Sequence, residues 1–405
     1  MFPVGFCASV ESRISGARRY APMQTFSLPT LLASMGAAAA LSFTLCWALV
    51  KSFSRHARYT ADAVGMGTQN RHGTAVPRVG GAAVGIAALG GTLCLPEPAA
   101  TLGRSFLLCA APALACGLAE DTTRRVAALY RLAATAASAV LAWYLLGAQL
   151  VPVGLVGLDL LLVAGASGLV LTVLAVAGIA NAANIIDGSN GLASGCLTIM
   201  LLAVALAAWK AGDLPLAAVA GVLACSLAGF MIVNYPSGQI FLGDGGAYFG
   251  GIAVAVLALV LVQRNPVVSP LFVFALTAYP VTETLYSAWR RMARRGRSPF
   301  VADRLHLHSL IQNRLLRCAD VPDRPGRNLE RNARTAPYLW LVCLCGVVPC
   351  TLAFTSSAAL GAGVALTVCA YGLLYRTVVR GRAPAWLRQE DTIARTTEGA
   401  PSVLS

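Results

Sequence analysis

Long apolar stretches alternate with short polar segments along most of the chain. Apolar runs of roughly 18 or more residues are typical of helices that cross a membrane. The eleven candidate stretches are Ser27–Val50, Val79–Leu95, Ser105–Ala119, Leu132–Leu150, Leu158–Ala180, Leu192–Trp209, Leu214–Val233, Gly246–Val262, Val267–Ser287, Ala336–Phe354 and Ala358–Tyr375. This pattern predicts an all-α, polytopic integral membrane protein with about 11 transmembrane helices.

The composition agrees with a membrane protein and explains the basic net charge of +14. The chain is 57% hydrophobic and only 12% charged, which excludes an ordinary soluble domain. With eleven spans, 25 of the 31 Lys and Arg residues fall on one side of the membrane. Positive charge accumulates on the cytoplasmic side, so the Arg-rich side is predicted to be inside. The excess therefore reflects topology and attraction for anionic lipid and substrate, and nucleic-acid binding is not expected.

The polar segments divide the chain into three regions. Residues 1–26 form an N-terminal extension without the apolar core of a signal peptide, and Met23 is an alternative start. Residues 27–378 form the transmembrane domain, which includes a cytoplasmic loop at 288–335, and residues 379–405 form a polar tail. The 12 cysteines lie mostly in apolar runs and contain no Cys-x-x-Cys pair, so they are interpreted as small hydrophobic residues.

Polar islands on the predicted cytoplasmic side carry the candidate chemistry. Residues 67–81 combine cations with glycines, which is also typical of a positive-inside anchor. Residues 117–125 place the adjacent carboxylates Glu120 and Asp121 at a helix end, where a solvated loop is the alternative. Adjacent acids suit a divalent cation because hard cations prefer oxygen ligands.

Two further islands contain amides and single acids. Asn181, Asn184, Asp187 and Asn190 recur every three residues, so at a helix end they would share roughly one face. In the segment 234–246, Asp244 lies between glycines, which let backbone N–H groups approach a ligand closely. For both islands a turn at an Asp-Gly pair is the alternative.

The long cytoplasmic loop adds cations to this face. Arg304, His306 and His308 lie close together there, and such a cluster can bind diphosphate oxygens. A His-x-His metal pair is the alternative. Carboxylates, amides and cations around one membrane face are the groups that phosphoryl transfer with Mg²⁺ requires. A membrane location implies that one substrate is a lipid.

Five segments, in order, resemble the bacterial polyprenyl-phosphate N-acetylhexosamine-1-phosphate transferases, which are relatives of the peptidoglycan precursor translocase. They are HGTAVPRVGG, GLAEDTTRRV, NAANIIDGSNGLASG, NYPSGQIFLGDGGAYFGG and SPFVADRLHLHSLI, within about residues 60–315. The resemblance implies a cytoplasmic, Mg²⁺-dependent site, with Mn²⁺ as a substitute, in a multi-pass protein of the bacterial inner membrane. It also implies transfer of sugar 1-phosphate from a UDP-N-acetylhexosamine to undecaprenyl phosphate with release of UMP.

The resemblance also implies roles for individual residues. Asp244 would bind the metal, Glu120 and Asp121 would lie near the lipid phosphate, and Asn184 and Asp187 would line the catalytic centre. Asn190 would lie near the uridine, and Arg304, His306 and His308 would contact the nucleotide sugar. The family usually has two aspartates where this chain has Glu120 and Asp121. It also commonly has an aspartate in place of Asn190, and a further histidine in place of Ser309.

Two other functions compete with this interpretation. The peptidoglycan precursor translocase, which transfers phospho-MurNAc-pentapeptide, typically has three consecutive histidines where this chain has His-Leu-His-Ser. A secondary transporter would also place polar residues in the membrane, but no inverted repeat is evident and the acids cluster at one surface. The hexosamine, the polysaccharide pathway (O-antigen, lipopolysaccharide or capsule) and the oligomeric state, for which a homodimer is one option, are left open.

Overall fold

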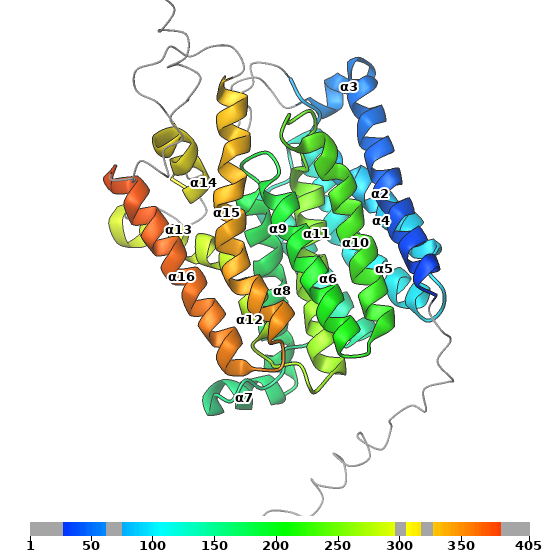
Figure 1. The fold of residues 1–405 in the computed structure, drawn as a ribbon, viewed down its shortest axis with the longest axis vertical. Helices are drawn as coiled ribbons and strands as arrows, with labels where there is room; N and C mark the ends of the chain where they lie inside the picture. The colour runs from blue at the N-terminus through cyan, green and yellow to red at the C-terminus, as the bar shows by residue number, and fades with distance from the viewer. Residues whose placement is uncertain (1–26, 62–74, 296–304, 317–326, 382–405) are drawn as a thin grey trace, which may run out of the picture.

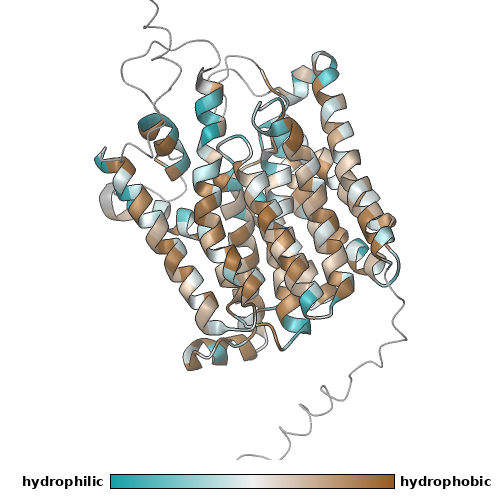
Figure 2. Ribbon diagram, viewed as in Figure 1, coloured by the Kyte–Doolittle hydropathy of each residue, from teal (hydrophilic) through white to brown (hydrophobic). Residues whose placement is uncertain are grey.

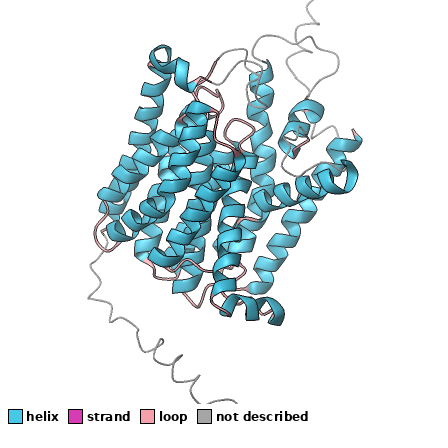
Figure 3. Cartoon of the chain, turned by 180° about the vertical axis from the view of Figure 1, so that it is seen from behind, coloured by secondary structure: helices cyan, strands magenta, loops and turns pink. Residues whose placement is uncertain are grey.

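The computed structural model describes residues 27–61, 75–295, 305–316 and 327–381. Within these ranges the chain consists of helices joined by loops, without a β-strand, as Figure 3 shows. The prediction of an all-α, polytopic membrane fold is confirmed. The N-terminal extension, residues 62–74, Arg304 and the tail from residue 382 lie outside the described residues.

Nine helices in the described part of the chain are long and apolar enough to cross a membrane. They are α2 (Leu28–Lys51), α5 (Ala99–Thr123), α6 (Ala128–Leu146), α8 (Ala166–Ile186), α9 (Leu192–Lys210), α10 (Leu214–Asn234), α11 (Gly243–Arg264), α15 (Arg327–Leu352) and α16 (Ser357–Arg380). The shorter elements are α3 (Phe53–Thr60), α4 (Gly80–Leu93), α7 (Val156–Val163), α12 (Phe272–Leu276), α13 (Ala278–Arg295), α14 (Leu307–Leu310) and the π-helical turn η1 (Ile311–Leu315).

Three of the eleven predicted spans take a different form. The stretch Leu158–Ala180 is divided between α7 and α8. The stretch Val79–Leu95 forms α4, an apolar helix of 14 residues. The stretch Val267–Ser287 breaks at Thr277 into α12 and α13. Helix α13 is strongly amphipathic and continues to Arg295, and α15 starts at Arg327, so the predicted loop 288–335 is helical at both ends.

The long helices stand side by side, with α3 and α14 at one end of the bundle and α7 at the other (Figure 1). Polar residues gather at the helix ends, and apolar residues fill the middle (Figure 2). Helix α11 lies at the centre and packs against α5, α8 and α9. Residues Gly243–Val262 of this helix are all buried, which explains why it is apolar on every face.

Glycines allow α4 and α5 to approach the first turn of α11. A Cβ on Gly81 would lie 2.2 Å from the backbone nitrogen of Gly246. A Cβ on Gly117 would lie 2.5 Å from the backbone of Gly245. Small residues at such contacts let helix backbones come close in a membrane. The first turn of α11 is thereby fixed against the loop before α4 and the last turns of α5.

Candidate active site

Asp244 lies in the first turn of α11 and is almost completely buried. Arg78 Nη2 lies 2.5 Å from Asp244 Oδ1, and Arg131 Nη1 donates to Oδ2 of the same carboxylate. Arg78 precedes α4, and Arg131 lies in the first turn of α6, so three segments distant in sequence meet here. Both oxygens of Asp244 therefore have a cationic partner, which offsets much of the cost of burying the charge.

Asp121, near the end of α5, binds the start of α11, the helix that carries Asp244. Its two oxygens accept hydrogen bonds from the backbone N–H groups of Asp244 and Gly245, at 2.8 and 2.9 Å. The first N–H groups of a helix have no partner within the helix, and a negative charge is stabilising there. Arg78 Nε also lies 3.2 Å from Asp121 Oδ1. Asp121 thus holds the start of α11, and with it Asp244, in place.

Gly243 occupies a position that only glycine fits. Its φ angle is +75°, and a Cβ there would lie 2.5 Å from Asp121 Oδ2. A residue with a side chain would be strained in this conformation and would displace the carboxylate. Gly243, next to Asp244, therefore allows the Asp121 carboxylate of α5 to lie close to the start of α11.

Glu120 does not share this role, although the sequence places it beside Asp121. Its Oε2 accepts a hydrogen bond from the backbone N–H of Val126 at 2.8 Å, which closes the loop after α5. Adjacent residues on a helix point about 100° apart, so only one of the pair faces α11. The structure assigns Glu120 a contact within its own loop and brings Asp121 into the cluster.

Asp187 caps the C-terminus of α8 and brings a third carboxylate to the cluster. It accepts a hydrogen bond from the backbone of Gly243. Burial and the nearby Asp244 carboxylate raise the pKa of Asp187 to about 7, while Arg78 acts in the opposite direction. This group therefore titrates near neutral pH, which is common for acids in active sites.

The amide row that precedes Asp187 is only partly directed to the site. Asn184 forms a hydrogen bond with the hydroxyl of Tyr248, on the second turn of α11. Asn181 donates to the carbonyl of Ala177 at 2.8 Å within its own helix. The expected shared face is thus divided: Asn184 contacts the central helix beside Asp244, and Asn181 belongs to the packing of α8.

Asn190 lies beside the carboxylates and is 2% exposed. Its backbone N–H donates to Asn332 Oδ1 at 2.6 Å, and its Nδ2 donates to the carbonyl of Pro236 at 3.1 Å. Asn234 in turn accepts from the backbone N–H of Gly191 at 2.6 Å. These contacts join the loop after α8 to the loop after α10 and to the start of α15.

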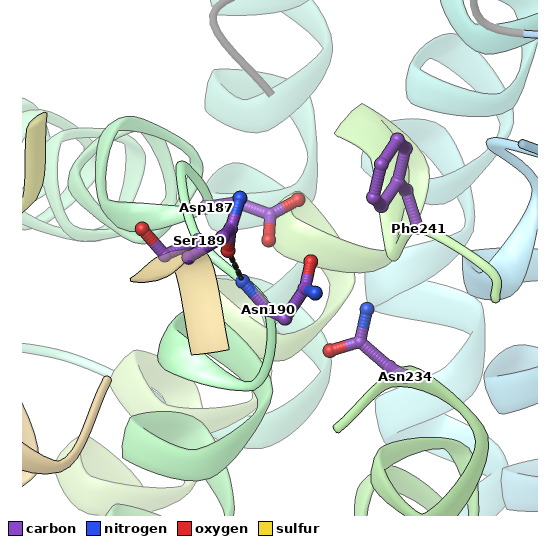
Figure 4. Close-up of a pocket in the computed structure, with 6 residues that line it drawn as sticks. Asp187, Ser189, Asn190, Asn234 and Phe241 are labelled. Atoms are coloured by element: carbon purple, nitrogen blue, oxygen red, sulfur yellow. Dashed lines mark hydrogen bonds between the residues drawn. The ribbon is translucent and has the colours of Figure 1, made fainter. Parts of the chain in front are cut away.

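A small pocket opens between these loops. It is lined by Asp187, Ser189, Asn190, Asn234, Phe241 and Asn332. Figure 4 shows the Asp187 carboxylate and the Asn190 and Asn234 amides directed toward the same space, with the ring of Phe241 at its side. Amide groups around an aromatic ring can bind a base-like ring by stacking and hydrogen bonds.

The two histidines of the long loop reach the same region. His308, in α14, is buried, and its ring packs against Gly188: a Cβ on that glycine would lie 2.1 Å from His308 Nε2. The rings of His306 and His308 are stacked with their centroids 5.6 Å apart. His306 Nδ1 pairs with Glu283 Oε1 at 2.9 Å. His308 therefore touches the loop that carries Asp187, and His306 is bound to α13.

Sequence reasoning assigned no individual role to five residues that complete the site. Arg131, Asn332 and Glu283 lie inside or beside stretches that were interpreted as a span or a loop. Arg78 and Asn234 lie in the polar islands 67–81 and 234–246, but neither was singled out. A single polar residue near the end of an apolar run could have drawn attention to Arg131 and Glu283, but nothing local indicates their partners.

The residues present suit a hard divalent cation in their chemistry. Asp187 and Asp244 offer oxygen ligands, and the described residues contain no group of three or more His, Cys, Asp or Glu side chains placed to hold a metal. Mg²⁺ in phosphate-handling sites is commonly bound by one or two carboxylates, with substrate oxygens and water completing the shell. A cation at Asp244 would have to replace at least one of its two guanidinium contacts.

Comparison with known proteins places this site in a family. Residues 104–262 match the glycosyl transferase family 4. The chain is 30% identical over 345 residues, 76% of this chain and 80% of the relative, to the decaprenyl-phosphate N-acetylglucosaminephosphotransferase of Mycolicibacterium smegmatis. It is 31% identical to the protein of the same name from Mycobacterium tuberculosis over 58% of this chain and 65% of the relative. It is 32% identical to the probable undecaprenyl-phosphate N-acetylglucosaminyl 1-phosphate transferase of Bacillus subtilis, over 34% of this chain and 38% of the relative.

The chain belongs to the polyprenyl-phosphate N-acetylhexosamine-1-phosphate transferases of glycosyl transferase family 4. It spans less than two thirds of the length of the Bacillus subtilis and Mycobacterium tuberculosis relatives. The matched segment includes Asp121, Asp187 and Asp244. The named relatives are transferases, so the secondary transporter alternative loses its support.

Proposed function

We propose that this protein transfers an N-acetylhexosamine 1-phosphate from a UDP-sugar to undecaprenyl phosphate and releases UMP. The observation that carries the proposal is the buried cluster of Asp121, Asp187 and Asp244 with Arg78 and Arg131. The cluster lies at one end of a membrane bundle, where a lipid phosphate and a soluble nucleotide can meet. The names of the relatives support a polyprenyl phosphate acceptor and an N-acetylglucosamine 1-phosphate donor.

The proposed reaction forms one bond and breaks one. An oxygen of the lipid phosphate attacks the phosphorus attached to the sugar, and the bond from that phosphorus to the bridging oxygen of UMP breaks. Two negatively charged phosphates must approach each other, so the site has to neutralise charge. Arg78 and Arg131 supply cations at the cluster, and His308 adds a further nitrogen donor beside the Asp187 loop.

Mg²⁺ is proposed as the cofactor, with Mn²⁺ as a substitute, and Asp244 as its ligand. When bound, the cation would neutralise charge on the diphosphate. Asp121 would hold Asp244 in place through the start of α11. Burial raises the pKa of Asp187 to about 7, and its carboxylate would face the reacting phosphates.

The pocket between the loops after α8 and α10 is proposed to receive the uridine. Its amides offer both donors and acceptors, and Phe241 offers a ring face. We further propose that the active site faces the cytoplasm of a bacterial inner membrane, because 25 of the 31 Lys and Arg residues fall on that side in the eleven-span topology. The reaction would then be the first membrane step of a cell-surface polysaccharide.

The test is to incubate purified protein with undecaprenyl phosphate, Mg²⁺ and a panel of UDP-sugars, and to measure UMP. The panel contains UDP-N-acetylglucosamine, UDP-N-acetylgalactosamine and UDP-MurNAc-pentapeptide. We expect UMP only in the presence of the lipid phosphate and one of the two N-acetylhexosamine donors. Activity with the pentapeptide donor alone would identify a peptidoglycan precursor translocase, and absence of UMP with every donor would overturn the proposal.

A further inference from the structure

Glu283 is a fully buried carboxylate outside the cluster around Asp244. It lies on α13, in a segment whose apolar character predicted a membrane span. A buried carboxylate is costly unless hydrogen-bond donors surround it. The residues that supply those donors show what the carboxylate stabilises.

The donors to Glu283 come mostly from the start of the histidine segment. His306 Nδ1 lies 2.9 Å from Glu283 Oε1. The backbone N–H of Leu307 donates to Oε2 at 3.2 Å. Ser287, one turn along α13, donates its hydroxyl to Oε1 at 3.1 Å. The carboxylate thus joins α13 to both a side chain and the backbone of residues 306–307.

This arrangement determines which nitrogen of His306 carries a proton. An ionised carboxylate only accepts hydrogen bonds, so Nδ1 of His306 must donate. A partner at one ring nitrogen fixes the tautomer and the orientation of an imidazole, as carboxylates do for metal-bound histidines. The stacked ring of His308 is oriented together with that of His306, because the two planes differ by only 6°.

A second contact from α13 supports the same segment. Arg290 is buried and donates to the carbonyl of Leu305 at 2.8 Å and to the hydroxyl of Tyr375 at 2.7 Å. Residues 305–307 are therefore bound at two points along α13, by Glu283 and by Arg290. The far side of His308 rests on Gly188, next to Asp187.

We infer that Glu283 is a positioning residue that fixes His306 and His308 against the Asp187 loop for binding of the nucleotide-sugar diphosphate. It acts through His306 and the backbone of Leu307. The inference rests on the proposed function, since it assigns the binding of the sugar donor to this histidine pair. It predicts that loss of the carboxylate weakens donor binding more than acceptor binding.

The experiment compares Glu283→Gln and Glu283→Asp with the wild type in detergent-purified, folded protein. Glu283→Gln is expected to raise the KM for the UDP-sugar by about tenfold or more, with a much smaller change in the KM for undecaprenyl phosphate. Glu283→Asp keeps the charge and is expected to recover part of the loss. Ser287→Ala removes one donor to Glu283 together with a 3.2 Å contact to His306 Nδ1, and it serves as the milder variant if Glu283→Gln does not fold.

Asp213→Asn is the matched control. Asp213 caps the start of α10 and accepts a hydrogen bond from the backbone N–H of Leu216 at 3.2 Å. It also pairs with Arg264 at 3.7 Å, and both residues lie at the opposite end of the bundle from the site. This control is expected to lower thermal stability without changing either KM. A Glu283→Gln variant that behaved like the control would overturn the inference and leave only a structural role.

A second readout does not depend on activity. In protein labelled with ¹⁵N-histidine, wild-type His306 is expected to carry its proton on Nδ1, with His306→Gln used to assign the signal. That signature should be lost or weakened in Glu283→Gln. A wild type with the proton only on Nε2 would overturn the inference even if no UDP-sugar gave UMP, whereas inactivity with the expected tautomer would count against the proposed function alone.

Discussion

At the scale of single residues, the site depends on carboxylates that are buried beside cations. Asp244 has Arg78 and Arg131 on its two oxygens. We expect Asp244→Asn to lower UMP release on the order of 100-fold or more, because the amide keeps the shape but supplies no charge for a divalent cation. Initial rates measured across a Mg²⁺ titration check this result.

Glu120→Gln is the control for that measurement. Glu120 bonds only to the backbone of Val126, so its amide variant is expected to stay within a few-fold of the wild type. Near-normal UMP release by Asp244→Asn, with unchanged Mg²⁺ dependence, would show that the metal binds elsewhere.

The raised pKa of Asp187 predicts how the stability of the folded protein depends on pH. The pKa is raised from 3.8 to about 7, so the folded protein holds this proton more tightly than the unfolded chain does. The folded state therefore loses stability as the pH rises from about 4 to about 7, and the full penalty is present above that range. In metal-free protein, Asp187→Asn is expected to raise Tm at pH 8 by at least about 2 °C while abolishing UMP release.

Thermal unfolding at pH 5 and pH 8, in the presence of a chelator, measures this effect. The increase in Tm caused by Asp187→Asn should be smaller at pH 5, because the wild-type carboxyl is already protonated in the folded state at that pH. A variant that is less stable than the wild type at both pH values would contradict the assigned shift.

At the scale of elements, the close approach of α5 to α11 places Asp121 against the N–H groups of Asp244 and Gly245. Gly117→Ala is expected to abolish activity and to lower the yield of folded protein, because the added Cβ would lie 2.5 Å from the Gly245 backbone. Overpacking of this kind costs about 1–3 kcal/mol or more. Size-exclusion profiles and UMP release check the result.

Gly178→Ala is the matched control, since this helical glycine in α8 has open space around its Cβ position. Its alanine variant is expected to keep activity and gain slightly in stability, because alanine is the better helix former. Equal behaviour of the two variants would show that the contact between α5 and α11 tolerates an extra methyl group.

At the scale of the whole molecule, the charge distribution predicts the orientation in the membrane. Reporter fusions after Arg264 and after Arg297 are expected to lie outside and inside respectively, because cations concentrate on the cytoplasmic side. In the eleven-span topology the chain would have to cross the membrane between these points through the broken pair α12 and α13. The same location for both reporters would refute the eleven-span topology.

The sequence determined the class of fold and part of the composition of the site. Apolar length defines membrane helices whatever their neighbours are, so the all-α bundle and most spans followed from the pattern. Asp121, Asp187 and Asp244 stood out because polar groups at the edge of apolar runs are costly. The two histidines stood out because they lie beside an arginine in the long loop, where such a cluster can bind diphosphate oxygens. The family resemblance followed from the same segments.

Only the tertiary structure decided which of those residues face one another. The sequence pairs Glu120 with Asp121, but helix geometry turns Asp121 toward α11 and Glu120 toward its own loop. The sequence likewise indicates no partner for Glu283, because His306 comes 23 residues later and contacts it only in the folded protein. Long-range contacts depend on how the helices pack, and local periodicity carries no information about that packing.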